Sequence, residues 1–331
     1  MPRIVRFYKT GGPEVLCLEE AAPETPAAGE VRLKIEAIGI NNSEAQYRRG
    51  VYPMKTTSFP TRLGREASGV VEAIGAGLTG VTVGDKVSTI PAFDIERHGV
   101  YGEWAVVPAI ALAKVPDKLS RVEAAAVFQQ YLTVYGPFVE YTDLMPGDTV
   151  VIVAAASSVG RGAIQVARML GCTVVATTRS PSKRDILLEG GAQHVVVSGT
   201  DDVVATVNKI TDGRGARLIF DPVAGPGLAD LVEAAASGGI IFEYGQLSSE
   251  PTPYPLVTCL RKGLSIRGYT LWEITLNPDR CARAKAWIYA ALEAGYLRPA
   301  IDRIFPLDRI VDAHRYIESG QQTGKIVVTA T

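Results

Sequence analysis

The stretch from residue 149 to residue 160 holds the residues best suited to bind an anion. It begins with apolar, β-branched residues, continues with alanines and serines, and leads into an amphipathic helical pattern that Gly171 ends. A strand, a tight turn and a helix start present backbone N–H groups and the positive end of a helix dipole to an anion, typically a pyrophosphate. The strict glycine fingerprint of dinucleotide binding is absent, so an ordinary tightly packed turn is the alternative. The expected pyrophosphate contacts are Ser157, Ser158, Val159 and Gly160.

A second apolar run, residues 173–177, ends beside two cationic side chains. Proteins that prefer NAD usually place an acid at this strand end, where it accepts a hydrogen bond from the adenosine ribose. This chain has no acid there, but it has Arg179 and, about one helical turn later, Lys183. Two cations suit the 2′-phosphate of NADP, although each could instead be a solvated surface base. We therefore predict NADP(H) as the cofactor, with contacts from Thr178, Arg179, Ser180 and Lys183.

Strands and helices continue to alternate as far as residue 244. Ser180 is expected to cap the helix that follows it. Later strands are expected at residues 194–197, 217–220 and 240–244, and later helices at 201–210 and 228–236. This alternation indicates a parallel sheet with helices on both faces, in which ligands bind at the carboxyl ends of the strands. The expected ligand edge includes four residues that could also be ordinary loop residues: Val223, Gly245, Gln246 and Leu247.

The chain before residue 125 has a different pattern, with short β runs separated by glycine and proline. These runs predict a compact, mainly β domain and cover residues 3–7, 30–37, 67–74, 85–90 and 103–107. A helical bridge is expected at 121–140, a β run at 264–269, helices at 279–294 and 307–319, and a last strand at 325–329. We expect the tail to return to the first domain, which gives a discontinuous domain of residues 1–125 with 265–331 and a second domain of residues 126–264.

The chain also carries a series of short motifs along most of its length. Besides the turn at 149–160, they cover residues 11–16, 37–41, 48–53, 64–71, 83–87, 132–135 and 323–325. In order and spacing they resemble the medium-chain dehydrogenase/reductase superfamily, on its zinc-independent quinone oxidoreductase branch. This resemblance implies an α/β fold with a GroES-like, mainly β domain, a Rossmann domain with a doubly wound parallel sheet, and a nicotinamide cleft between them.

The resemblance also implies which residues lie near the nicotinamide. Asn41 and Tyr52 are the expected catalytic residues. Tyr52 would orient the substrate or donate a proton, and the alternative is an aromatic ring that only packs at the domain edge. The cofactor contacts implied by the resemblance are Asn41, Gln46, Thr133, Tyr244, Tyr269, Leu271 and Lys325.

The chain departs from the family pattern at two places. Relatives usually carry paired glycines where this chain has the two serines of the pyrophosphate turn, and the quinone reductases often carry a tyrosine where it has Gln46. Tyr47 is adjacent, which leaves open which of the two faces the nicotinamide. Arg48 and Glu66 are expected to form a structural ion pair without a chemical role.

The residues themselves disfavour a zinc site. Catalytic zinc needs three protein ligands, usually Cys, His or a carboxylate. Zinc-dependent relatives carry a Cys near the position of Asn42 or Ser43 and a His where this chain has Arg65. We expect no metal site, because the cysteines and histidines are widely scattered: Cys17, Cys172, Cys259, Cys281, His98, His194 and His314.

Composition limits the other possibilities. The 331 residues suit two domains, and 34 basic against 35 acidic side chains give a net charge of −1, which provides no footprint for nucleic acid or an anionic membrane. There is no uncharged span of 18 residues and no apolar targeting segment at the start. Together with cysteines that show no pairing pattern, this predicts a cytoplasmic protein.

The expected activity is direct hydride transfer from NADPH to a small, electron-poor substrate such as a quinone or an enone. Without zinc no Lewis acid polarises an alcohol, whereas a conjugated system needs only hydride and a proton. The family resemblance further implies a homodimer. The alternatives are an enoyl-thioester reductase, a zinc-free alcohol or carbonyl dehydrogenase, and a non-catalytic dinucleotide-binding protein with a structural or sensing role.

Overall fold

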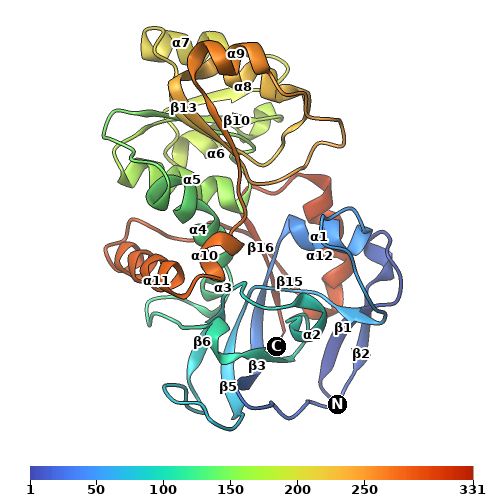
Figure 1. Cartoon of the computed structure of the whole chain (residues 1–331). Coiled ribbons are helices and arrows are strands. Elements are labelled where there is room, and N and C mark those ends of the chain that lie inside the picture. Colours follow the sequence, from blue (N-terminus) through green and yellow to red (C-terminus); the bar gives the residue numbers. More distant parts are fainter. Residues whose placement is uncertain (331) are drawn as a thin grey trace. The chain divides into compact units, whose positions relative to one another are not determined.

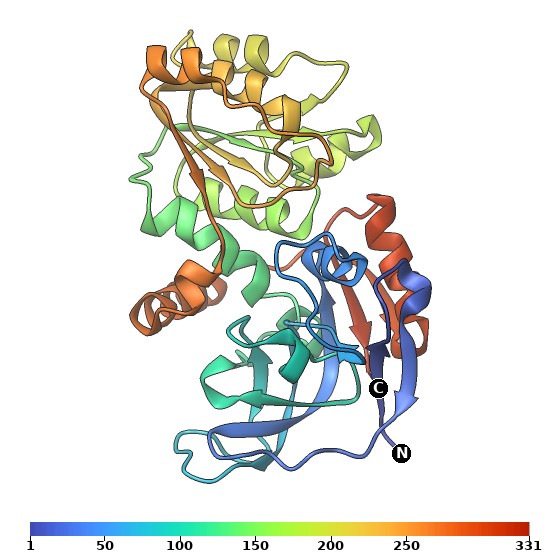
Figure 2. The same cartoon turned by 45° about the vertical axis from the view of Figure 1, so that its right-hand side comes forward.

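The computed structural model describes residues 1–330 and divides the chain into two compact units (Figure 1). Unit 1 contains Met1–Gln129 and the chain from Pro299 onward, and unit 2 contains Gln130–Arg298. Figure 2 shows the C-terminal strand and helix, in red, beside the blue N-terminal strands. Unit 1 is therefore discontinuous in sequence.

Unit 1 is built on two sheets. The larger sheet has the strand order β15-β16-β3-β5-β6-β8, and β7 also pairs with β3. Its strands are β3 (Glu30–Ile40), β5 (Ala67–Ile74), β6 (Lys86–Thr89), β7 (Trp104–Pro108), β8 (Leu112–Lys114), β15 (Ile301–Pro306) and β16 (Lys325–Thr329). The smaller sheet contains β1 (Arg3–Phe7), β2 (Cys17–Glu20) and β4 (Thr61–Arg62). The helices of this unit are α1 (Asn42–Arg49), α2 (Ile95–His98), α3 (Arg121–Ala124) and α12 (Ile310–Ser319).

The long strand β3 organises unit 1. Val31, Leu33 and Ile35 alternate along it and point into one apolar core. The last strand of the chain, β16, pairs antiparallel with β3 so that Ile326 lies opposite Ile40. This register brings the first residue of β16 next to the residue that follows β3, although the two are far apart in the sequence.

Unit 2 contains a parallel sheet with the order β11-β10-β9-β12-β13-β14. The strands are β9 (Thr149–Ile152), β10 (Thr173–Thr178), β11 (His194–Val197), β12 (Ala216–Asp221), β13 (Ala235–Glu243) and β14 (Ser265–Gly268). Strands β10 and β11 lie on one side of β9, and the later strands β12, β13 and β14 lie on its other side. A crevice for ligands is expected where the order reverses, between β9 and β12.

Helices cover both faces of this sheet. In Figure 1, α7 (Val203–Thr211), α8 (Leu228–Ala234) and α9 (Leu256–Lys262) lie on one face. On the other face lie α5 (Ser158–Met169) and α6 (Arg184–Glu189). The remaining helices of the unit are α4 (Phe128–Tyr135), which continues as a π-helix (Gly136–Glu140), α10 (Trp272–Thr275) and α11 (Pro278–Glu293).

The structure differs from the sequence prediction at the second domain border. Residues 265–298 belong to unit 2 and not to the first domain, because β14 pairs in parallel with β13 and extends the Rossmann sheet. The first border also moves, from residue 125 to Gln129. β14 was predicted as a strand, but nothing in its local sequence says which sheet it joins.

The predicted helical bridge at residues 121–140 is interrupted. Helix α3 ends at Ala124, where Ser88 Oγ donates a hydrogen bond to the Ala124 carbonyl at 2.8 Å. Ser68 Oγ likewise donates to the Arg121 carbonyl at 2.6 Å. The Ser88 hydroxyl thus satisfies the Ala124 carbonyl, which a continuing helix would have used, while the Arg121 carbonyl also accepts from the Ala125 N–H at 3.2 Å.

Helices α1 and α9 and strand β15 were not predicted, because their sequences lack a clear apolar period. Among residues 1–330, no helix is long and apolar enough to span a membrane.

Candidate active site

The predicted pyrophosphate turn joins β9 to α5. Ser157 is the N-cap of α5, and its Oγ accepts a hydrogen bond from the Gly160 N–H at 3.1 Å. A Cβ atom on Gly160 would lie 2.6 Å from the Cα of Ala155, so the helix can begin this close to the turn only with glycine there. The N–H groups of Ser158 and Val159 belong to the first turn, which has no intrahelical acceptor for them. The turn therefore offers donors and a positive dipole end, and its donor set fits a pyrophosphate.

The end of β10 carries the predicted cationic residues. Arg179 is exposed and Lys183 is half-buried in the short turn before α6. Thr178 Oγ1 accepts a hydrogen bond from the Ser180 N–H at 3.2 Å, which fixes the strand end. The predicted role of Ser180 as a helix cap is wrong, because its side chain makes no capping hydrogen bond. The next acidic side chain is Asp185, so the strand end is positively charged and suits a phosphate.

The loops after β12 and β13 form one connected surface at the same sheet edge. The Leu247 N–H donates to the Pro222 carbonyl at 3.0 Å, and the Ser248 N–H donates to the Val223 carbonyl at 2.9 Å. The structure thus brings together the residues predicted for this edge: Val223, Gly245, Gln246 and Leu247. Tyr244 begins the second loop, and its ring stacks on Phe220 with centroids 3.9 Å apart.

A pair of carboxyl groups that the sequence analysis missed lies beneath these loops. Asp221 and Glu243 are the last residues of β12 and β13 and lie opposite each other in the register. Burial raises the pKa of Asp221, and hydrogen bonds that it accepts from the N–H groups of Val223 at 2.7 Å and Ala224 at 3.1 Å oppose this shift. Burial and the Asp221 charge raise the pKa of Glu243 to about 8, so Glu243 carries a proton at neutral pH. The available signal was an acid ending each of two adjacent buried strands.

Three further predicted residues lie on or beside α4 and β14. Thr133 is buried in α4. Tyr269 follows β14, and its hydroxyl donates to the Leu132 carbonyl at 3.2 Å. A Cβ on Gly136 would lie 2.4 Å from that hydroxyl, so the Tyr269 side chain packs closely against the π-helix that continues α4. Leu271 is half-buried at the start of α10.

In unit 1, Asn41 and Lys325 meet at the register between β3 and β16. Lys325 Nζ donates to Asn41 Oδ1 at 2.7 Å and also to Glu66 Oε2. Glu66 Oε1 accepts from the Gln129 N–H at 2.8 Å, at the start of α4. The side chains of Lys325 and Glu66 are fully buried. A buried ion pair of this kind is strongly coupled, because either charge alone would be uncompensated.

Asn41 is also the N-cap of α1, and a second buried network supports it from below. Glu44 Oε2 accepts hydrogen bonds from the Asn41 N–H at 2.9 Å and from the Tyr101 hydroxyl at 2.8 Å. His314 Nε2 lies 3.1 Å from the Tyr101 oxygen, and burial lowers the pKa of His314 to about 3, so its ring is neutral. Burial raises the pKa of Glu44, which its hydrogen-bond donors oppose. The sequence analysis did not identify this network, because its members come from three distant segments.

The ion pair predicted between Arg48 and Glu66 is wrong. Arg48 instead pairs with Glu318 of α12 and donates to the Gly11 carbonyl at 2.9 Å. Glu66 pairs with Lys325. Motif order placed the two residues in the same region, but only the strand register determines which buried charges meet.

The remaining predicted residues of unit 1 lie on α1 and just beyond it. Tyr47 is buried and its hydroxyl donates to Glu96 at 2.5 Å, so Tyr47 faces the core of unit 1. Gln46 is half-buried, and its carbonyl accepts from the Tyr52 N–H at 3.2 Å. The half-buried Tyr52 ring lies 5.7 Å from the Arg65 guanidinium, a cation–π distance.

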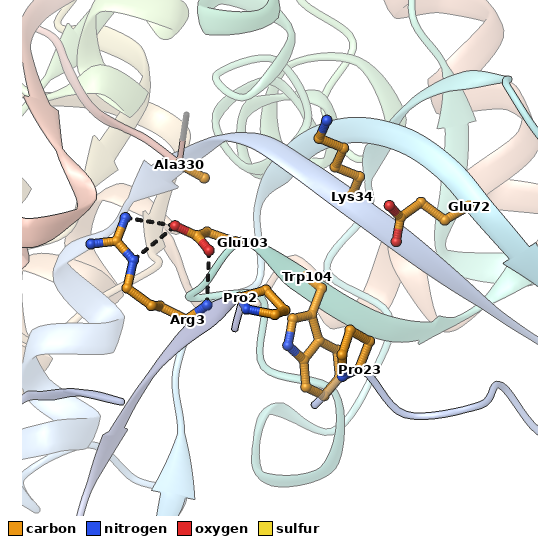
Figure 3. Close-up of a pocket in the computed structure, with 8 residues that line it drawn as sticks. All are labelled: Pro2, Arg3, Pro23, Lys34, Glu72, Glu103, Trp104 and Ala330. Carbon is orange, nitrogen blue, oxygen red and sulfur yellow. Dashed lines mark hydrogen bonds and ion pairs between the residues drawn. The ribbon is translucent and has the colours of Figure 1, made fainter. Parts of the chain in front are cut away.

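Other hollows and clusters do not add to this site. The surface pocket in Figure 3 lies in unit 1, around the Arg3–Glu103 ion pair and Trp104, and none of the predicted site residues lines it. Among residues 1–330 no three His, Cys, Asp or Glu side chains are grouped so that they could hold a metal ion.

Comparisons with known proteins show which families and relatives this chain resembles. A family model described as "Zinc-binding dehydrogenase" matches residues 158–286, and one described as "Alcohol dehydrogenase GroES-like domain" matches residues 27–117. The chain is similar to a 2-haloacrylate reductase of a Burkholderia species, with 31% identity over 97% of both chains. It is also similar to a quinone oxidoreductase of Pseudomonas aeruginosa, with 30% identity over 99% of both chains.

Among solved structures, the fold is similar to the Escherichia coli quinone oxidoreductase complexed with NADPH. The TM-score is 0.90, the identity is 27%, and the match covers 99% of both chains. Taken with the family models and the relatives of nearly equal length, this confirms the predicted family and its two domain types. The chain belongs to the medium-chain dehydrogenase/reductase superfamily, on its quinone oxidoreductase branch.

Proposed function

We propose that this protein is an NADPH-dependent reductase of quinones or other conjugated carbonyl compounds, acting by direct hydride transfer without zinc. One observation carries the proposal. The sheet edge of unit 2 combines a helix-start turn suited to a pyrophosphate with a cationic, acid-free end of β10 suited to a 2′-phosphate. This donor set fits NADPH, and a solved quinone oxidoreductase of the same fold is complexed with it.

When bound, NADPH supplies the hydride, and the residues of this chain bind, orient and protect it. The α5 turn holds the pyrophosphate, and Arg179 and Lys183 hold the 2′-phosphate. Val223 and residues 244–247 line the edge along which the cofactor extends. Asn41 and Tyr52 act at the reacting end, where Asn41 donates a hydrogen bond and Tyr52 orients the acceptor or supplies a proton.

The zinc-free mechanism is supported by the side chains at the positions where zinc-dependent relatives carry ligands. These positions hold Asn42, Ser43 and Arg65. Arg65 is a buried cation, and a second positive ion beside it would be repelled. Hydride addition to a conjugated acceptor needs no Lewis acid, because the electron pair moves to the carbonyl oxygen and the proton comes from water or a side chain.

A substituted acrylate is the second candidate acceptor. The observation that favours it is the similarity to a 2-haloacrylate reductase, which is as extensive as the similarity to the quinone oxidoreductases. Enoyl thioesters belong to the same chemical class, because they too are conjugated carbonyl compounds.

We further propose that the protein is a homodimer of the cytoplasm. Strand β14 is the edge of its sheet, and the neighbouring α9 exposes Val257 at 78% and Leu260 at 73%. An unpaired edge beside exposed apolar side chains is suited to pairing with a second copy. The four cysteines are free thiols, as expected in a reducing compartment.

The test is steady-state NADPH oxidation against a panel of quinones, enones, 2-haloacrylates and enoyl thioesters, with metal analysis of the same preparation. We expect turnover with at least one conjugated class and no stoichiometric zinc. Tight NADPH binding without any turnover would favour a non-catalytic dinucleotide-binding protein. Activity that requires one zinc per chain and is lost to a chelator would refute the zinc-free mechanism.

A further inference from the structure

Asn41 and Glu44 form a capping box at the start of α1, in which the Asn41 side chain faces the Glu44 N–H. An asparagine at a helix N-cap normally uses Oδ1 to accept a hydrogen bond from the first turn. Here the Asn41 backbone carbonyl accepts from the Glu44 N–H at 3.1 Å, and the Glu44 carboxylate accepts from the Asn41 N–H at 2.9 Å. The cap uses the backbone and the side-chain oxygen of Asn41, which leaves the side-chain nitrogen Nδ2 for another use.

Lys325 fixes which end of the amide faces which way. An ammonium group has three donors and no acceptor, so the Asn41 atom that lies 2.7 Å from Lys325 Nζ must be Oδ1. The nitrogen then lies on the opposite side, where Nδ2 donates one N–H to the Gly39 carbonyl at 3.2 Å. Its second N–H has no acceptor among the described residues.

The Lys325 side chain is itself held on every side. Glu66 pairs with Nζ, and Glu66 Oε1 is bound by the Gln129 N–H at 2.8 Å. Beneath them, a Cβ on Gly39 would lie 2.7 Å from Lys325 Cε and 2.8 Å from Glu66 Oε2. Glycine at this position gives the ion pair its room against the backbone of β3.

We propose that Lys325 is a positioning residue, which together with Glu66 locks Asn41 as a hydrogen-bond donor to the carbonyl oxygen of the acceptor. In this proposal Lys325 touches neither the acceptor nor the cofactor, which differs from the cofactor contact that the family resemblance implies. The inference rests on the proposed function, because it assigns Asn41 its role in that reduction.

The reaction step balances without any further reagent. Bound NADPH would supply a hydride from C4 of its nicotinamide to the electron-poor carbon of the acceptor and would be left as NADP⁺. The displaced π-electron pair of the acceptor would move to its carbonyl oxygen. The Asn41 N–H stabilises the negative charge on that oxygen until a proton from water neutralises the product. A donor held in place beforehand lowers the barrier more than one that must first reorient.

Two variants test the two parts of this proposal. Asn41→Asp keeps an oxygen opposite Lys325 but replaces the Nδ2 donor with an acceptor. Its kcat should fall about 100- to 1000-fold, as when one oxyanion donor is removed, while NADPH affinity stays within about threefold. Lys325→Met combined with Glu66→Gln removes both charges, so that neither is left buried alone. Its kcat should fall about tenfold or more, with NADPH affinity again within about threefold.

The matched control is Arg3→Met with Glu103→Gln, which removes the ion pair of unit 1 shown in Figure 3. It should leave kcat and NADPH affinity at wild-type values. A further readout is independent of turnover. The side-chain amide of Asn41 should show slowed hydrogen exchange by NMR in the wild type, and the Lys325/Glu66 double variant should lose this protection.

Failure of the inference and failure of the proposed function give different results. A wild type that reduces no conjugated acceptor would overturn both. An active wild type whose Lys325/Glu66 double variant keeps kcat within twofold would overturn the inference alone. So would a double variant that keeps kcat but loses tenfold or more in NADPH affinity, because Lys325 would then be a cofactor ligand.

Discussion

The two units hold their predicted site residues in opposite ways. Unit 2 uses backbone N–H groups at a helix start, loops at a sheet edge and an exposed cation at Arg179. Unit 1 uses side chains of Lys325 and Glu66 that are completely buried. The exposed donors of unit 2 are suited to bind the negative charge of a ligand. The buried ion pair of unit 1 is already formed within the folded protein.

This difference has energetic consequences. Removing a charged group at an exposed edge lowers the free energy of unfolding only slightly, because water replaces the group as a partner of its neighbour. Water cannot reach a buried charge that has lost its partner. The uncompensated desolvation of that charge therefore lowers the free energy of unfolding. Substitutions in unit 2 should therefore change affinity with little loss of stability, whereas substitutions in the buried network of unit 1 should change both stability and turnover.

The largest effect is expected for Lys325→Met alone. This variant leaves the Glu66 carboxylate buried without its ammonium partner and should destabilise the protein by about 3–5 kcal/mol. Adding Glu66→Gln should restore part of that loss, since no charge is then uncompensated. Urea denaturation of the two variants measures the difference. Equal stability of the single and the double variant would show that the pair is not electrostatically coupled, and the contrast between the units would fail.

The next effect is expected for Ser158→Asp at the pyrophosphate turn. Two unit charges 4 Å apart interact by about 4 kcal/mol at an effective dielectric constant of about 20, so NADPH affinity should fall about 100-fold or more. Stability should change little, because Ser158 lies at the partly exposed first turn of α5. The uncharged Ser158→Asn is the control. If calorimetry gives the same dissociation constant for Ser158→Asp and the wild type, the turn does not bind the pyrophosphate.

A smaller and more selective effect is expected for Arg179→Ala. A charge-assisted hydrogen bond contributes about 1.5–3 kcal/mol, so NADPH affinity should fall about 10- to 100-fold, while NADH affinity should barely change. The ratio of the two dissociation constants is the decisive quantity, because a general defect would weaken both. Lys209→Ala, which removes an exposed cation from α7 of the same unit, is the control. A wild type that prefers NADH, or equal weakening of both cofactors, would contradict the NADP(H) assignment.

The difference between the two units also explains which site residues could be predicted from the sequence alone. The predicted site residues of unit 2 depend on local chemistry. A strand, small residues and a helix start occur within twelve positions, and Arg179 directly follows the next strand, so the turn, the sheet and the cationic end could be predicted from neighbouring residues. Ser180 was predicted as a cap from residue type alone, and the short 3-10 turn before α6 removed that role.

The arrangement of the predicted site residues of unit 1 depends on strand register. Lys325 meets Asn41 only because β16 pairs with β3 at one register, and a shift of one residue would turn Lys325 to the other face of the sheet. Glu66 was assigned the wrong partner for the same reason. Family resemblance named Asn41 and Lys325 as site residues but gave no indication that one would orient the other.

The smallest effect is expected for Glu243→Gln in unit 2. Glu243 and Asp221 form a carboxyl pair that is largely buried, unlike the exposed groups at the same sheet edge. The pKa of Glu243 is raised to about 8 from its usual 4.5, mainly by burial and then by the charge of Asp221. The folded protein therefore holds a proton that the unfolded chain releases above pH 4.5. The stability contributed by this proton is complete below pH 4.5 and is lost progressively as the pH rises to about 8.

Glutamine resembles the protonated acid and does not titrate, so the Glu243→Gln variant should gain stability relative to the wild type across this pH range. After discounting for partial solvent exposure, we expect a relative gain of about 1–2 kcal/mol between pH 5 and pH 8. Thermal unfolding at several pH values measures it, and Glu250→Gln in the exposed loop after β13 should parallel the wild type. A constant stability difference between Glu243→Gln and the wild type over the whole range would show that Glu243 is ionised like an ordinary surface acid.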